Sequence, residues 1–179
     1  MNSTVSNLIH QAASARVRLL ATTAQLTEEE AGLKPGNEQW SISNIVEHLV
    51  LSEHYELNKL WQTMEEARSG KKWSGEHIHR GLSIEEVIAR TWKPQEQTPP
   101  YALPRIGGPL AYWKECLICS QSILDVLGNC LEGLDLESMI FPHPLAGPLD
   151  ARQRLELIRL HMDRHVAQIE RIRAATPAR

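Results

Sequence analysis

Two histidines near the end of the chain have the spacing of a metal-binding pair. His161 and His165 are four residues apart in a run whose apolar residues recur in steps of three and four, as on one face of an α-helix: Leu155, Ile158, Met162, Ile169 and Ile172. Side chains four residues apart on a helix lie within about 6 Å at Cβ, so both imidazoles can reach one metal ion. The ordinary alternative is that each imidazole bonds to a carbonyl, a carboxylate or a water molecule.

A third histidine belongs to another predicted helix. Ser41 can cap this helix, which is expected to extend to about Arg68 and carries His48 in its first turns. At about 100° per residue, His48 lies beside the centre of the apolar stripe, so periodicity alone indicates a surface or cleft histidine. A metal ligand at the edge of a helix seam would occupy such a half-buried position.

Long helices must position these residues. Apolar residues in steps of three and four predict helices over four segments: 3–26, 41–68, 109–131 and 150–175. Strand-like alternation is absent, which predicts an all-α fold, a four-helix bundle. Pro109 is expected at the first position of the third helix, and Asp150 with Gln153 is expected to cap the fourth. Arg16 and Arg18 lie off the apolar stripe of the first helix and are expected to be solvated.

Two connections between the helices are long. Residues 69–82 are polar and contain His77 and His79, which are expected to be solvated because such loops are mobile. Residues 92–109 are rich in proline, and loops of this length usually cover a site or fold over the core. A third connection contains His143, which is expected to position that loop.

Composition limits the classes of protein that fit. Of the 179 residues, 42% are hydrophobic, which fits a single domain over residues 1–179. The net charge is −3 with acidic and basic residues interspersed, so stable nucleic-acid binding is not expected. No apolar run approaches the ~18 residues of a membrane span, and no signal peptide is recognisable. With only three cysteines, the cytoplasm is the expected location. Cys116 and Cys119 have CxxC spacing, but mid-helix they are expected to be buried structural thiols.

Taken together, these motifs resemble the DinB/YfiT-like superfamily. The matching segments, which occur in the family's order and cover nearly the whole chain, are Trp40-Ser41-Ile42, Glu47-His48-Leu49, His143-Pro144-x-x-Gly147-Pro148 and His161-x-x-x-His165-x-x-Gln168-Ile169. The resemblance implies a bundle of up-down-down-up topology, in which the long connection joins the second and third helices.

The resemblance also implies a divalent metal ion held by His48, His161 and His165. Three neutral imidazoles with open coordination positions form a catalytic rather than a structural type of site. Zinc is the default ion, and nickel, iron or manganese would also accept imidazole. The other ring nitrogens of the ligands need hydrogen-bond partners. Candidate partners are Glu47, Glu53, Asp163 and, if it does not only position its loop, His143.

Three functions remain open at this point. Characterised members of the superfamily use a low-molecular-weight thiol, as S-transferases and as a thiol-dependent isomerase. Because a metal ion favours the nucleophilic thiolate, the first hypothesis is a thiol S-transferase that acts on small electrophiles in detoxification or stress response. The second is a metal-dependent hydrolase, although the pair lacks the glutamate that follows the first histidine in zincin proteases. The third is a non-catalytic, stress-induced helical protein with a structural metal.

The resemblance also bears on the oligomeric state. Members of the superfamily often pair through helix faces, so a homodimer is compatible with the resemblance. The apolar stripes do not identify which helices would meet.

Overall fold

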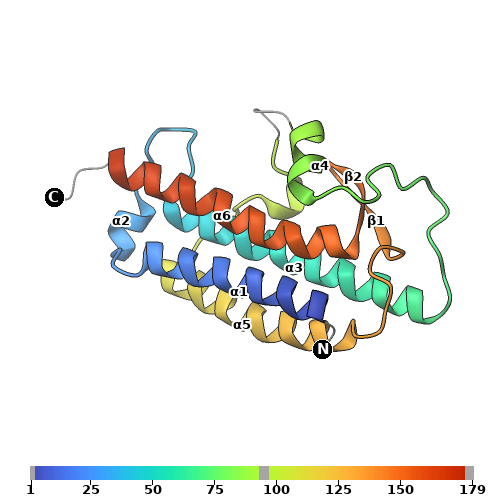
Figure 1. Ribbon diagram of the computed structural model, residues 1–179. Coiled ribbons are helices and arrows are strands. Elements are labelled where there is room, and N and C mark those ends of the chain that lie inside the picture. The colour runs from blue at the N-terminus through green and yellow to red at the C-terminus, as the bar shows by residue number, and fades with distance from the viewer. Residues whose placement is uncertain (1–2, 93–96, 176–179) are drawn as a thin grey trace.

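Four long helices make up most of the structure. The computed structural model describes residues 3–92 and 97–175, and it confirms the prediction of a mainly helical protein. The long helices are α1 (Ser3–Thr23), α3 (Ile42–Arg68), α5 (Leu110–Cys130) and α6 (Ala151–Ala175). As Figure 1 shows, α1 and α6 run in one direction, whereas α3 and α5 run in the opposite one. Helix α1 packs against α6, and α3 packs against both α5 and α6.

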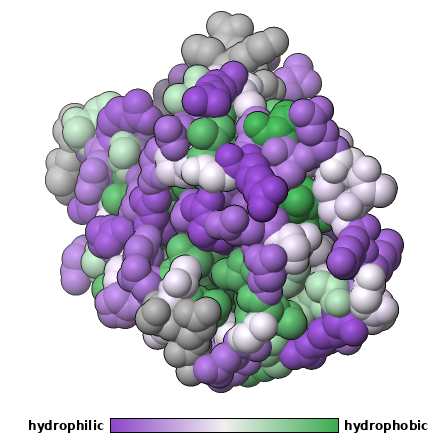
Figure 2. Space-filling model, turned by 45° about the vertical axis from the view of Figure 1, so that its right-hand side comes forward, coloured by the Kyte–Doolittle hydropathy of each residue, from purple (hydrophilic) through white to green (hydrophobic). Residues whose placement is uncertain are grey.

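The core of this bundle is formed by the apolar stripes seen in the sequence. Its fully buried side chains come from all four long helices and include Leu19, Leu60, Leu124 and Ile169. None of the helices in the described part of the chain has a stretch that is both long and apolar enough for a membrane span. On the face drawn in Figure 2, hydrophilic side chains predominate, and apolar residues show mainly in the gaps between them.

A short β-hairpin, which the sequence did not indicate, precedes α6 and leaves the fold mainly helical. Strand β1 (Ile140–His143) pairs antiparallel with β2 (Gly147–Asp150), and Phe141 lies opposite Leu149. Strands of four residues are too short to show alternation in the sequence. At the tight turn, Gly147 has a φ of 75°, which glycine adopts without the steric cost that a side chain would add.

Two of the long helices are capped at their N-termini by residues close in the sequence. Ser41 and Asn44 form a reciprocal capping box for α3, and Asp150 and Gln153 exchange two hydrogen bonds of 2.8 and 3.1 Å at the start of α6. Both caps were expected from the sequence. Helix α5, however, begins at Leu110, one residue after its expected first residue, Pro109.

A distant carboxylate caps α5 instead. Proline has no side-chain hydrogen-bond acceptor, and Pro109 occupies the N-cap position. The carboxylate of Glu28, in the short helix α2 (Glu28–Gly32), accepts hydrogen bonds from the free amides of Leu110 and Ala111 at 2.6 and 3.0 Å. This contact ties the α1–α3 connection to the start of α5.

A second, smaller apolar cluster joins the hairpin to α6. Ile84 and Val87 of the short helix α4 (Ile84–Thr91) pack against Leu149 of β2 and Leu157 of α6. Helix α4 therefore lies against α6 (Figure 1), and Trp92, the residue after it, lies near Arg164 of α6.

Candidate metal centre

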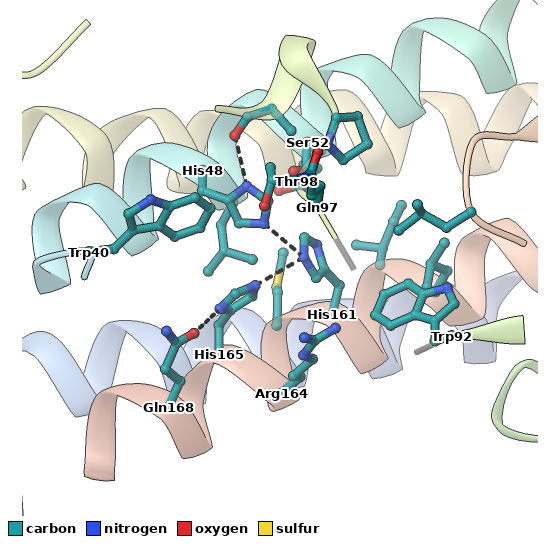
Figure 3. A pocket seen from close by; sticks show the side chains of 18 of the residues that line it. Trp40, His48, Ser52, Trp92, Gln97, Thr98, His161, Arg164, His165 and Gln168 are labelled. Carbon is teal, nitrogen blue, oxygen red and sulfur yellow. Dashed lines mark hydrogen bonds between the residues drawn. The ribbon is translucent and has the colours of Figure 1, made fainter. Parts of the chain in front are cut away.

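The structure brings together the three histidines that the sequence singled out. His48 extends from α3, and His161 and His165 extend from α6 toward the same point (Figure 3). The Nε2 atom of His161 lies 3.1 Å from the Nε2 atoms of both His48 and His165, and the three ligand atoms all lie within 4.8 Å of one another. The triad is therefore compact enough to hold one metal ion.

His48 is more deeply buried than its place in the helical periodicity indicated. It is 6% exposed, as is His165, so the interpretation of His48 as a surface residue is wrong, whereas the cleft interpretation holds. The periodicity placed His48 at the edge of the apolar stripe of α3. That edge faces α6 and the loop before α5, which together cover the imidazole.

Hydrogen bonds to the other ring nitrogens orient two of the three imidazoles. Nδ1 of His48 lies 2.8 Å from the backbone carbonyl oxygen of Ala102, and Nδ1 of His165 lies 2.7 Å from Oε1 of Gln168. Both oxygens only accept hydrogen bonds, so each Nδ1 carries the proton and donates it. In the neutral imidazoles, Nε2 is then an unprotonated lone-pair donor directed at His161.

The converging nitrogens lack hydrogen-bond donors. Three Nε2 atoms meet at the centre of the triad, and two of them carry no proton. The third, on His161, can supply at most one hydrogen atom to its two neighbours. Lone pairs that face one another without a donor repel, whereas a cation placed between them attracts each one. The donor set therefore fits a divalent metal ion of borderline softness.

Burial keeps these ligands in the form that binds metals. Removal from solvent lowers the pKa of His165 to about 3 and the pKa of His161 well below its ordinary value of 6.5. The pKa of His48 is lowered for the same reason, although the hydrogen bond to Ala102 opposes the shift. All three imidazoles are consequently neutral at pH 7, so a metal ion has no ligand proton to displace there.

A cavity opens onto the triad. Its volume is about 570 Å³, within the range of small-molecule sites, and the three histidines form part of its wall. The remaining lining includes the aromatic side chains of Trp40, Trp92 and Tyr101. The ring of Trp40 packs 4.9 Å from the ring of His48. The histidine triad therefore borders a space large enough for a small molecule.

The long loop before α5 forms one wall of this cavity. In its described part, residues 97–109, the short 3₁₀ helix η1 (Pro100–Ala102) packs on α3 and supplies the carbonyl group that orients His48. Further along the loop, three consecutive backbone amides donate hydrogen bonds to the carboxylate of Glu47. They belong to Arg105, Ile106 and Gly107, at 2.6, 2.7 and 3.2 Å. Glu47 thus fastens the loop and, through it, positions His48. This arrangement agrees with the expectation that the loop over residues 92–109 covers a site. Residues 93–96 of this loop lie outside the described residues.

The carboxylates expected to support the histidines have other partners. Glu47 binds the loop, Glu53 pairs with the buried guanidinium of Arg16, and Asp163 pairs with Arg18 at 2.6 Å. The true partners are a backbone carbonyl and Gln168. A backbone carbonyl leaves no mark in a sequence. Gln168, however, lies three residues after His165 on the same helix face, a spacing that could have identified it.

The ion pair between Arg16 and Glu53 also corrects the expectation that Arg16 is solvated. Arg16 is 3% exposed, and its guanidinium bonds to Gln121 of α5 as well as to Glu53 of α3. Burial raises the pKa of Glu53 to about 7, against the opposing effect of the positive charge on Arg16. Arg18 is half exposed, as expected.

Three further histidines, His77, His79 and His143, lie at the hairpin. Nδ1 of His143 accepts hydrogen bonds from the amides of Leu145 and Ala146 at 3.2 and 3.1 Å, so His143 positions the hairpin turn as expected. His79 was expected to be solvated, but it is buried and donates to the carbonyl oxygen of Ala146 at 2.7 Å. Nε2 of His77 lies 3.6 Å from Oδ2 of Asp150. These contacts hold the loop after α3 to the hairpin.

The cysteines are not part of the cavity wall. Cys119 is exposed, and Cys116 and Cys130 are partly buried, all three as free thiols. The prediction of buried structural thiols is therefore wrong, most clearly for Cys119. This residue lies between Leu117 and Ser120, which face the core, and its own side chain faces away from it.

No protein-family model matches the chain, and no curated protein matches it either.

Proposed function

We propose that the protein is a metal-dependent enzyme of the DinB-like superfamily, most nearly a thiol S-transferase that acts on small electrophiles. The observation that carries this proposal is the convergence of three neutral imidazole nitrogens on the wall of a cavity large enough for a small molecule. The helix directions in Figure 1, with a long connection between α3 and α5, support the up-down-down-up topology that the resemblance implies.

The number of ligands favours an enzyme over a structural site. Structural zinc sites are closed by four protein ligands, whereas catalytic sites keep a position open. Within the described residues, the cluster contains three ligands, and none of the nearby carboxylates bonds to it. Zinc is the ion we propose, with nickel, iron and manganese as alternatives that imidazole also accepts.

In this proposal the chain holds, orients and shields the reactants. A divalent ion at the triad would favour the thiolate form of a small thiol, which is the nucleophilic form. Ala102 and Gln168 fix the ring orientations of His48 and His165, and the indole of Trp40 limits access of water to His48. In the transfer, the sulfur forms a bond to the electrophilic carbon. The leaving group departs with its bonding electron pair, and the thiol proton passes to solvent.

Conjugation assays test this function. Zinc-loaded protein, metal-free protein and a His161→Ala variant would each be mixed with 1-chloro-2,4-dinitrobenzene and a series of small thiols, and thioether formation would be followed. We expect conjugation only with the zinc-loaded native protein. A His10→Ala variant, altered at an exposed histidine of α1, serves as the control and should remain active.

Other outcomes would favour the alternatives. Metal-dependent cleavage of ester or amide substrates without conjugation would favour the hydrolase. Stability lost on chelation, with no turnover of either kind, would favour a non-catalytic helical protein with a structural metal.

A further inference from the structure

Two arginines, Arg164 and Arg171, line the cavity, and Arg164 lies beside His161 of the triad. Arg164 lies three residues after His161 and directly before His165, so it shares the side of α6 that carries both ligands. Its side chain forms part of the cavity lining, and Figure 3 shows it next to His161. Its positive charge contributes to the lowered pKa of all three triad histidines, which agrees with its position close to them.

The guanidinium of Arg164 is held by an aromatic ring rather than by a carboxylate. Its central carbon lies 4.9 Å from the centre of the Trp92 ring, a cation–π distance. Among the residues that the structure describes, it has no hydrogen bond or ion pair. By contrast, Arg16 and Arg154 are each paired with a carboxylate. The N–H groups of Arg164 are therefore positioned by Trp92 but still available for a ligand.

None of the carboxylates in the described cavity lining pairs with the positive charge of Arg164. Glu53 and Glu56 line the cavity, but each is buried in an ion pair, with Arg16 and Arg154 respectively. Glu38 is the remaining acidic residue in the described lining, and it is exposed to solvent. A divalent ion on three neutral imidazoles would add further positive charge, so the part of the cavity next to the triad attracts anions.

We propose that Arg164 is the anion-recognition residue of this cavity and selects small molecules that carry a carboxylate. A guanidinium presents two parallel N–H groups that match the two oxygens of a carboxylate, which explains why arginine suits the position better than lysine. As a specificity for the thiol, this inference rests on the proposed function. The chemical class it names is a carboxylate-bearing thiol whose sulfur reaches the triad while its carboxylate pairs with Arg164.

Calorimetric titration of zinc-loaded protein tests the inference without measuring activity. The probes are 3-mercaptopropionate, the uncharged 2-mercaptoethanol, and propionate, which has the carboxylate but no sulfur. We expect native protein to bind 3-mercaptopropionate about tenfold more tightly than 2-mercaptoethanol. This factor is at the lower end of the contribution of a hydrogen bond to a charged group, because Arg164 is exposed to solvent. The Arg164→Gln change should abolish this preference, and Arg164→Lys should retain part of it.

A matched variant controls for the loss of charge itself. Arg159→Gln removes an arginine of the same helix that pairs with Glu85 and does not line the cavity, and it should keep the tenfold preference. Equal affinities for the two thiols in native protein, or an unchanged preference in Arg164→Gln, would overturn the inference while leaving the proposed function standing. If neither thiol binds but propionate binds in an Arg164-dependent manner, the thiol transferase is contradicted and the anion site is kept. Absence of binding by all three probes would overturn both.

Discussion

The histidine triad and the ion pair between Arg154 and Glu56 are buried polar clusters on the wall of the same cavity, and they are satisfied in different ways. Arg154 is fully buried. Its Nη1 donates to both carboxylate oxygens of Glu56 at 2.9 and 2.7 Å, and its Nη2 donates to the carbonyl oxygen of Phe141 at 3.0 Å. The guanidinium also lies 3.8 Å from the centre of the Phe141 ring. Apart from Nε of Arg154, which has no partner among the described residues, the pair is bonded within the chain and fixes α3, β1 and α6 relative to one another.

The triad lacks an equivalent set of internal partners. Its outer nitrogens on His48 and His165 are bonded, but its three inner nitrogens face one another with at most one hydrogen atom among them. A buried polar group without a partner costs about 1–3 kcal/mol. The three inner nitrogens of the triad could instead be satisfied by one metal ion. Burial does not distinguish the two clusters: the ion pair leaves Nε of Arg154 without a partner among the described residues, whereas the triad brings three ring nitrogens together at one point, where each can offer a lone pair.

The largest expected effect is on the ion pair. The Arg154→Met change leaves the Glu56 carboxylate buried without its partner and should lower the free energy of unfolding by about 3–5 kcal/mol. Urea unfolding of the metal-free proteins measures this loss. The double change Arg154→Met with Glu56→Met should recover most of the stability. A loss below about 1 kcal/mol, the range of exposed pairs, would show that the ion pair does not have the structural role assigned to it.

The next effect concerns the hydrogen bond that orients His165. Replacing Gln168 with leucine removes the acceptor of the Nδ1 proton and should weaken zinc binding about 10–100-fold, as loss of such outer partners usually does. Competition with a chelator of known affinity measures the change. Gln168→Glu provides a matched comparison, because a carboxylate still accepts this proton and should keep the affinity. Equal affinities in the leucine and native proteins would mean that the hydrogen bond does not hold the ring.

Glu47 acts one step further from the triad, so its effect should be smaller. The Glu47→Ala change releases the amides of residues 105–107 and, through the loop, loosens the Ala102 carbonyl group that orients His48. We expect about a tenfold loss of zinc affinity, at the lower end for outer partners. Glu66→Ala, at an exposed residue of the same helix, is the control and should bind zinc normally. Unchanged zinc affinity in Glu47→Ala would show that the loop does not orient His48 for metal binding.

A further effect is a dependence of the folding stability on pH at Glu53. Burial raises the pKa of this carboxyl group from 4.5 to about 7, so between these values the folded protein keeps a proton that the unfolded chain releases. The contribution of Glu53 to the free energy of unfolding therefore decreases as the pH rises from 4.5 to about 7. The stability of metal-free native protein should fall relative to that of Glu53→Gln across this window, since the other titrating groups are shared. Parallel stability curves for the two proteins would contradict the shift.

What the sequence predicted correctly rests on local relations. The caps at Ser41 and Asp150 involve residues three apart, and His161 and His165 share a helix face by spacing alone. These features follow from helix geometry and need no knowledge of the rest of the fold. His48 is different, because periodicity left its role undecided and a family resemblance supplied it.

What the sequence missed depends on contacts between distant segments. The cap of α5 comes from Glu28, more than eighty positions earlier, and the orientation of His48 depends on a backbone carbonyl in another loop. Arg16 was expected in solvent because its helix alone could not reveal Glu53 across the core. Side-chain partners of this kind become visible only when the helices are placed together.

The most direct test of the account is metal binding by the three histidines. Elemental analysis and zinc titration would be carried out on the native protein and on the His48→Ala, His161→Ala and His165→Ala variants, with His10→Ala as the control. We expect about one divalent ion per native chain, lost in each triad variant while the helical content is kept, because three ligands from two helices share one ion. A native protein that takes up neither zinc nor nickel, or triad variants that bind as tightly as His10→Ala, would contradict it.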